Sequence, residues 1–293
     1  MRIKFYLQIL YLQSMKISDF HNYSLQVLKK GMVIIMKYYV VDVFTDERFH
    51  GNPAGVCLVD KALDASIMQK IAFENNLAET AFLVKKDGYY DLRWFTPEVE
   101  IDLCGHATLG SAYVIMSYVE PEKNIVEFHT LSGVLTVTRI GELFTLNFPV
   151  RKPVPCETPN NLERALGVKV LETHMARDLL VLLEDENDLV NLKPDYSLLS
   201  KIDQVFGFIV TARGTEYDFV SRFFAPGAGI PEDPVTGSSH TTLIPFWSER
   251  LGKKEMVARQ LSKRGGTLWC KKLQERVEIS GTAVTYLIGD IIV

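Results

Sequence analysis

Several features are absent from the sequence, and each absence excludes a class of protein. No uninterrupted apolar run reaches about 18 residues, so no segment is expected to cross a membrane as a helix. No basic block occurs and the formal net charge is −4, which makes nucleic acid a poor partner. No glycine-rich phosphate loop or dinucleotide fingerprint occurs, which agrees with an enzyme that uses no cofactor.

Cysteine and histidine are scarce and scattered. The 4 cysteines form no CxxC pair, which favours a reduced, cytoplasmic protein over a disulfide scaffold or a zinc site. His50, His129 and His174 have no metal-ligand spacing, so no metal is predicted. The 293 residues, 47% of them apolar, suffice for a large core in one large domain or two ordinary ones.

The first 35 residues differ from the rest of the chain. Their basic start and apolar "FYLQILYL" are faintly typical of a signal peptide, but glutamines interrupt the run and no small-x-small cleavage site follows. We expect residues 1–35 to be an upstream extension or an over-called start, with the working protein beginning at Met36. A helical arm that packs on the surface is the alternative.

Two halves of the chain resemble each other. "YDLRWFTPEVEIDLCGHATLGSAYV" begins at Tyr90 and "YDFVSRFFAPGAGIPEDPVTGSSHTTLIPFW" begins at Tyr217. Both predict a strand with an arginine and an aromatic pair, then a proline, a short loop, a glycine and a helix. Shorter segments before and after these two stretches also resemble each other and follow in the same order in both halves, which indicates duplication. We therefore predict lobes at 36–150 and 151–293, with the last strand of the chain as a candidate to complete the first lobe.

The patterning predicts a mixed sheet around one central helix in each lobe. Short runs rich in Val, Phe, Tyr and Thr predict strands at 37–44, 80–85, 91–95, 125–129, 134–138, 143–148, 206–211 and 218–224. Helices are expected at 65–76, 106–118, 160–166 and 238–251. The segment 106–118 is apolar nearly all round and is expected to be buried. Pro245 predicts a kink or a late start in the last helix.

Both central helices are expected to start directly after a glycine. Gly105 precedes His106, and Gly237 precedes Ser238. Free backbone N–H groups at a helix start attract anions. Two equivalent helix starts that face each other across a cleft would hold a small carboxylate from both sides.

Four stretches resemble the PhzF family of phenazine-biosynthesis-like isomerases. They are "VFTDERFHGNPAGVCLV", "NNLAETAFL", "RWFTPEVEIDLCGHATLGSA" and "RFFAPGAGIPEDPVTGSSHTTLIPFWSERLGK". The likeness extends from Met36 to near the C-terminus. It implies an α+β fold of two pseudo-equivalent lobes, each a mixed sheet or barrel around a central helix, as in diaminopimelate epimerase and proline racemase. It also implies a homodimer.

The resemblance assigns roles residue by residue. The proton-transferring glutamate of the family falls on Glu79, its cleft histidine on His106, and its aspartate and serine on Asp233 and Ser238. Asn52 becomes a cleft residue on the same ground. The carboxylate would contact Gly105, Gly237 and Ser238.

Each candidate also has a plain structural interpretation. A glutamate at a strand start is usually solvated, His106 could merely cap its helix, and Ser238 is an ordinary helix-start residue. Asp233 could be an acid stabilised by the helix dipole, and Asn52 a turn former. We expect His240 to be structural, because it lies one turn inside the helix.

The epimerase and racemase relatives use two cysteines as bases. Cys104 approaches one of these positions, but Thr236 occupies the other, which argues against a two-thiol enzyme. Cys104 on its own is more typical of a small buried residue.

We therefore expect a cofactor-independent isomerase of a small carboxylate. In an apolar cleft, Glu79 could take a proton from one carbon and return it to another. His106 and Asp233 would orient Glu79 and manage the developing charge. An amino-acid racemase or epimerase using Cys104, and a non-catalytic protein that binds a small acid, are the alternatives. The sequence does not name the substrate.

Overall fold

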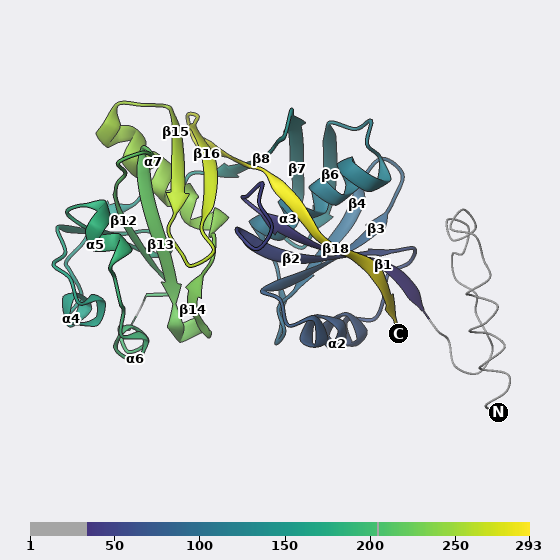
Figure 1. The fold of residues 1–293 in the computed structure, drawn as a ribbon, viewed down its shortest axis with the longest axis horizontal. Coiled ribbons are helices and arrows are strands. Elements are labelled where there is room, and N and C mark those ends of the chain that lie inside the picture. Colours follow the sequence, from purple (N-terminus) through teal and green to yellow (C-terminus); the bar gives the residue numbers. More distant parts are fainter. Residues whose placement is uncertain (1–33, 204) are drawn as a thin grey trace, which may run out of the picture.

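The computed structural model describes residues 34–203 and 205–293, and Figure 1 shows two lobes side by side. None of the helices in these two ranges is long and apolar enough to span a membrane. The first lobe contains β1 (Ile35–Val43), β2 (Asn52–Val59), α2 (Ala65–Asn75), β3 (Glu79–Lys85), β4 (Tyr90–Phe95), β5 (Glu100–Ile101), α3 (Gly105–Val114), the π-helical turn η2 (Ile115–Val119), β6 (Ile125–Thr130), β7 (Gly133–Ile140) and β8 (Leu143–Pro149).

The second lobe follows β8, and the chain then returns to the first lobe. The second lobe contains β9 (Val154–Pro155), α4 (Leu162–Leu166), β10 (Glu172–Met175), β11 (Leu179–Leu182), α5 (Glu186–Val190), α6 (Tyr196–Leu199), β12 (Phe208–Arg213), β13 (Phe219–Ala225), the 3₁₀ turn η3 (Pro226–Ala228), β14 (Ile230–Asp233), the 3₁₀ turn η4 (Gly237–Ser239), α7 (His240–Leu251), β15 (Glu255–Gln260), β16 (Gly266–Lys272) and β17 (Arg276–Gly281). The last strand, β18 (Ala283–Ile292), runs back along β1 in Figure 1.

The strand pairing of the first lobe recurs in the second. In the first lobe β2 pairs with β3 in parallel, β3 with β4 antiparallel, and β4 with β6 in parallel. In the second lobe β11 and β12, β12 and β13, and β13 and β15 repeat this order and these directions. An antiparallel pair, β8 and β17, joins the two sets. The α+β fold with two equivalent lobes is confirmed.

A matching ion pair occupies the same place in each lobe. Arg93 contacts both carboxylate oxygens of Glu100 at 2.6 and 2.7 Å, and Arg222 contacts those of Glu232 at 2.7 and 3.0 Å. Each arginine also lies over the phenylalanine two positions later, at 5.2 and 5.0 Å from the ring centre. Glu232 therefore ties β13 to β14 and is not part of the candidate site.

Helix α3 is the central helix of the first lobe. Its buried residues include 8 of its 10 positions, as the all-round apolar sequence predicts. A Cβ at Gly110 would lie 3.2 Å from Val43 Cγ2, so this glycine lets the helix approach β1 closely. The regular helix ends at Val114, before the predicted 118, and continues as the π-helical turn.

Helix α7 is the central helix of the second lobe, and it starts late. A 3₁₀ turn occupies Gly237–Ser239, and the α-helix begins at His240. Pro245 lies inside the helix and has no N–H to donate. The backbone carbonyl of Thr241, four residues before it, instead accepts the N–H of Arg151 at 3.0 Å. The proline thus frees an acceptor for the segment that joins the lobes.

The C-terminal strand completes the first lobe. β18 pairs antiparallel with β1 along the whole of β1, and the N–H of Ile34 donates to the carbonyl of Val293 at 2.9 Å. Because β1 begins at Ile35, the predicted start at Met36 falls inside this strand. The expectation that residues 1–35 are an upstream extension mostly concerns residues 1–33, and these lie outside the described part of the chain.

Candidate active site

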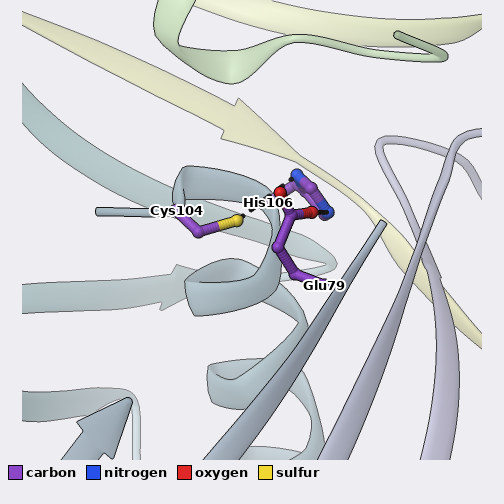
Figure 2. Close-up of side chains that lie close together, drawn as sticks. All are labelled: Glu79, Cys104 and His106. Carbon is purple, nitrogen blue, oxygen red and sulfur yellow. Dashed lines mark hydrogen bonds and ion pairs between the residues drawn. The ribbon is translucent and has the colours of Figure 1, made fainter. Parts of the chain in front are cut away.

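Three buried polar atoms without a hydrogen-bond partner gather where the lobes meet. They are Asn52 Oδ1, Glu79 Oε2 and His106 Nε2. Folded proteins rarely leave such groups unsatisfied, so three of them together call for an explanation such as a role in binding or catalysis. Two of the three side chains are close together in Figure 2.

Glu79 is the first residue of β3, where that strand lies in parallel beside β2. Its side chain is only 14% exposed, which argues against a merely solvated strand end. Glu79 Oε2 lies 3.0 Å from His106 Nε2. Neither atom forms a well-aligned hydrogen bond, so the contact acts mainly through charge.

His106 is the second residue of α3 and lies between Glu79 and Cys104 (Figure 2). Glu79 approaches its Nε2, whereas Cys104 Sγ lies 3.6 Å from its Nδ1. Burial lowers the pKa of His106, but the contact with Cys104 and the carboxylate of Glu79 outweigh burial and raise that pKa well above its ordinary value. Glu79 supplies the negative charge, because the Cys104 thiol is itself protonated. The structure therefore favours a charged imidazole beside the carboxylate.

Cys104 precedes α3 and is buried. Burial, and then the nearby carboxylate of Glu79, raises the pKa of the Cys104 thiol, and the opposing effect of His106 does not cancel this rise. The thiol is therefore protonated near neutral pH and is a poor base. This agrees with the interpretation of Cys104 as a small buried residue.

Asn52 ties the two lobes together at this site. It is the first residue of β2 and fully buried. Its Nδ2 donates to Asp233 Oδ1 and to the carbonyl of Val235, both at 2.9 Å. These two bonds use both amide hydrogens, so the 3.4 Å contact of Nδ2 with His106 Nδ1 is a close approach and not a third full bond.

Asp233 ends β14 and lies opposite Asn52. Although the residue as a whole is only partly buried, burial of its carboxyl raises the pKa of Asp233, while His106 and Thr236 oppose that change. The hydroxyl of Thr236 donates to Asp233 Oδ2. Gln260 supports both residues, since its amide bonds the Asp233 carbonyl and the Thr236 N–H at 2.8 Å each. Sequence reasoning missed Gln260, because a glutamine inside a strand carries no signal of its own.

The two predicted glycine turns lie near each other. Cα atoms of α3 and η4 come within 8 Å of each other. A Cβ at Gly105 would lie 3.6 Å from the ring of Phe148, and one at Gly237 would lie 3.5 Å from the ring of Phe44. Each helix start is thus covered by one phenyl ring, in an arrangement that repeats between the lobes.

Ser238 and His240 differ in their surroundings. Ser238 is partly exposed and its Oγ accepts from Arg177 Nη2 at 3.4 Å. His240 is fully buried, and its Nδ1 donates to the carbonyl of Thr236 at 2.9 Å. His240 contacts none of Glu79, His106 and Asp233, as its expected structural role implies.

The sequence predicts no metal site, but the fold gathers Glu79, Cys104 and His106. One potential ligand atom from each lies within 4.8 Å of the other two. However, Glu79 and Cys104 approach opposite ring nitrogens of His106. An ion bound to one nitrogen would leave one of these ligands on the far side of the ring, so the geometry suits proton transfer better than a single metal ion.

Two cavities lie away from this cluster. One of about 280 Å³ lies beside α2, with Phe82 and Arg93 in its wall. The other, of about 410 Å³, lies on the outside of α7, with Lys152 and Arg250 in its wall. Neither touches the cluster. We assign the site from its unsatisfied and charged buried groups, because these carry chemistry that cavity size does not.

The family model described as phenazine biosynthesis-like protein, PhzC-PhzF, matches residues 41–289. The chain belongs to this family. The resemblance seen in the sequence is therefore confirmed over most of the chain.

Relatives of the chain are similar along almost their full length. An uncharacterized isomerase of Pseudomonas aeruginosa is 48% identical over 251 residues, covering 86% of this chain and 96% of the relative. A crystal structure of a PhzF family protein from Enterococcus faecalis has a TM-score of 0.87 at 46% identity, covering 88% and 99% of the two chains. A hydroxyproline epimerase from Agrobacterium vitis shares the fold at 12% identity, with a TM-score of 0.59 over 88% and 93%. Three relatives at 46–48% identity are named as isomerases, which places this chain among the isomerases.

Proposed function

We propose that this member of the PhzC-PhzF family is a cofactor-independent isomerase of a small carboxylate, with Glu79 as the proton-transferring base. The observation that carries the proposal is the 3.0 Å approach of Glu79 to His106 in a buried site that leaves three polar atoms unsatisfied. An enzyme that moves a proton needs a base that can accept and return it, and a fixed charge beside that base.

The proposed reaction has two proton transfers. The carboxylate of Glu79 takes a proton from an activated carbon, and the electron pair of the broken C–H bond moves into the conjugated carboxylate to form an enolate. Glu79, now a carboxylic acid whose proton exchanges with solvent, then gives a proton to another carbon of the conjugated system. The double bond shifts, and the enzyme returns to its starting state.

The surrounding groups would hold the developing charge. The His106 imidazolium lies beside the base, and Asp233 is fixed by Asn52 and Thr236. Backbone N–H groups at Gly105, His106, Gly237 and Ser238 are proposed to bind a carboxylate or enolate oxygen. Preorganised donors of this kind are worth about 3 kcal/mol each when they are removed from comparable sites.

The alternatives have less support. A racemase with two thiol bases would need a cysteine at Thr236, whose hydroxyl instead bonds Asp233. The raised pKa of the Cys104 thiol argues against it as a base. A non-catalytic acid-binding protein would have no need for a buried carboxylate in contact with an imidazole.

Proton exchange in heavy water separates these three functions. The full chain would be incubated in D₂O with a panel of β,γ-unsaturated acids, cyclic dienoic amino and hydroxy acids, and proline, and followed by NMR. We expect a shifted double bond with deuterium at a new carbon. Exchange at a stereocentre without a shift would support a racemase. Binding with neither change would support the non-catalytic function.

The oligomeric state and the cellular location of the protein are further parts of the proposal. The family resemblance implies a homodimer, and the cysteine usage implies a cytoplasmic location. Light scattering on purified protein would test the first, and fractionation of the source cells the second. A monomer at micromolar concentration would contradict the dimer.

A further inference from the structure

Arg177 lies beside Ser238 and is paired with the buried carboxylate of Asp178. Arg177 Nη2 donates to Asp178 Oδ2 at 2.7 Å, its Nε contacts both Asp178 oxygens at 3.1 Å, and Nη2 reaches Ser238 Oγ at 3.4 Å. The guanidinium also lies over the ring of Phe206, 5.1 Å from its centre. Asp178 is 1% exposed, so its charge is committed to this cluster.

Arg151 is the second cation of the cluster. Its backbone N–H donates to the carbonyl of Thr241 at 3.0 Å, which fixes it beside the first turn of α7. Burial and then the nearby charge of Arg177 lower the pKa of Arg151, and Asp178 opposes them. Arg151 Nη1 is buried and has no hydrogen-bond partner among the described residues. The cluster thus holds two positive charges and one negative charge.

Arg151 is only partly buried, but a guanidinium nitrogen held away from water without a partner is costly, because it lacks the hydrogen bonds that water would supply. A guanidinium binds carboxylate and phosphate oxygens through parallel N–H bonds, and it does so better than an ammonium. The surplus charge, the unsatisfied Nη1 and the hydroxyl of Ser238 therefore suit an acidic group of a ligand.

We propose that Arg151, Arg177 and Ser238 form an anion subsite that binds a second acidic group of the substrate. This inference rests on the proposed function in one respect, namely that the reacting carboxylate lies at the starts of α3 and η4. The substrate class then narrows to small acids with two acidic groups, the second being a carboxylate or a phosphate.

Matched pairs of acids test the subsite by isothermal titration calorimetry on the full chain. The pairs are propionate and malonate, butyrate and succinate, and valerate and glutarate, which differ only in the second carboxylate. We expect at least one diacid to bind about tenfold or more tightly than its partner, because charge-assisted hydrogen bonds are stronger than neutral ones. Replacing that diacid by the corresponding phosphono acid distinguishes a carboxylate from a phosphate preference.

Arg151→Met is the main variant, because Arg151 leaves no partner unpaired when it is removed. We expect the advantage of the diacid to fall to about twofold or less, with the affinity for the monoacid unchanged. Arg177→Lys keeps a charge beside buried Asp178 and should lower the ratio of diacid to monoacid affinity by severalfold. Arg151→Lys should do the same, and it replaces Arg151→Met if that variant does not fold. Lys152→Met removes an exposed charge one residue further on and should leave the advantage intact.

Three results would overturn the subsite. They are equal affinity for both members of every pair, a diacid advantage that survives Arg151→Met, and an equal loss for monoacid and diacid in that variant. The last result would show that the arginines hold the reacting carboxylate itself. The titration needs no turnover, so it stands apart from the exchange experiment that tests Glu79.

Discussion

The amide of Asn52 donates to the carboxylate of Asp233 at 2.9 Å, across 181 positions of sequence and from one lobe to the other. The same nitrogen also donates to the carbonyl of Val235 at 2.9 Å. This fully buried side chain therefore fixes the second-lobe acid against the first-lobe pair of Glu79 and His106.

Asn52→Ala should lower both stability and activity. It leaves two buried acceptors without their donor, and each such loss costs about 1–3 kcal/mol. We expect urea unfolding to show a loss of about 2–4 kcal/mol in the free energy of unfolding. Asn160→Ala, at an exposed position, is the matched control and should change little. Equal stability of the two variants would show that Asn52 does not tie the lobes.

Glu79→Gln should remove the base and leave the shape of the site. The amide cannot accept the proton, so we expect the rate of deuterium exchange to fall by about 10²–10⁴-fold, with ligand affinity much less affected. Glu74→Gln, on the exposed face of α2, should exchange at the wild-type rate. Wild-type exchange in Glu79→Gln would mean that another group is the base.

Cys104→Ala should retain most of the activity. A buried thiol with a raised pKa contributes packing and a contact with His106 but no base, so we expect a loss of less than about tenfold. Cys270→Ala removes a buried thiol of the second lobe and controls for the loss of packing. If Cys104→Ala abolishes turnover while Glu79→Gln retains it, the racemase alternative is correct.

His240 should make the protein less stable in acid. Burial lowers the pKa of His240 to about 4. An unfolded histidine has a pKa near 6.5 and binds its proton first as pH falls. The unfolded state therefore holds more protons between about pH 6.5 and 4, and the free energy of unfolding falls across this window by up to about 3 kcal/mol.

The variant His240→Asn isolates this contribution. Asparagine retains a donor toward the carbonyl of Thr236 but does not titrate. Urea unfolding of both proteins at about pH 7 and about pH 4.5 should show a smaller acid-induced loss in the variant. Equal losses would show that other groups account for the acid sensitivity.

The ion pair Arg222–Glu232 should contribute more to the free energy of unfolding than the equivalent pair Arg93–Glu100. The side chains of Arg222 and Glu232 are 11% and 19% exposed, whereas those of Arg93 and Glu100 are 36% and 25% exposed. Arg222 also donates to two backbone carbonyls. We expect Arg222→Met to cost about 3 kcal/mol or more and Arg93→Met about 1 kcal/mol. Thermal and urea unfolding of the two variants would measure this difference, and equal costs would contradict it.

Features encoded by neighbouring residues were predictable. The repeated strand, glycine and helix segments predict two equivalent lobes, because hydrophobic periodicity and glycine at a helix start act within a few residues. The resemblance then led to Glu79, His106, Asn52 and Asp233, and the fold brings these four side chains together. Their roles in the reaction stay predictions.

Features that depend on distant contacts were not predictable. Gln260 supports Asp233 from a strand 27 positions away, and Arg151 Nη1 is buried without a hydrogen-bond partner where its segment meets α7. The sequence by itself determined the two helix starts and the residue types between them. Burial and charge pairing decided which of these residues act together, because both depend on groups that only the folded chain brings into contact.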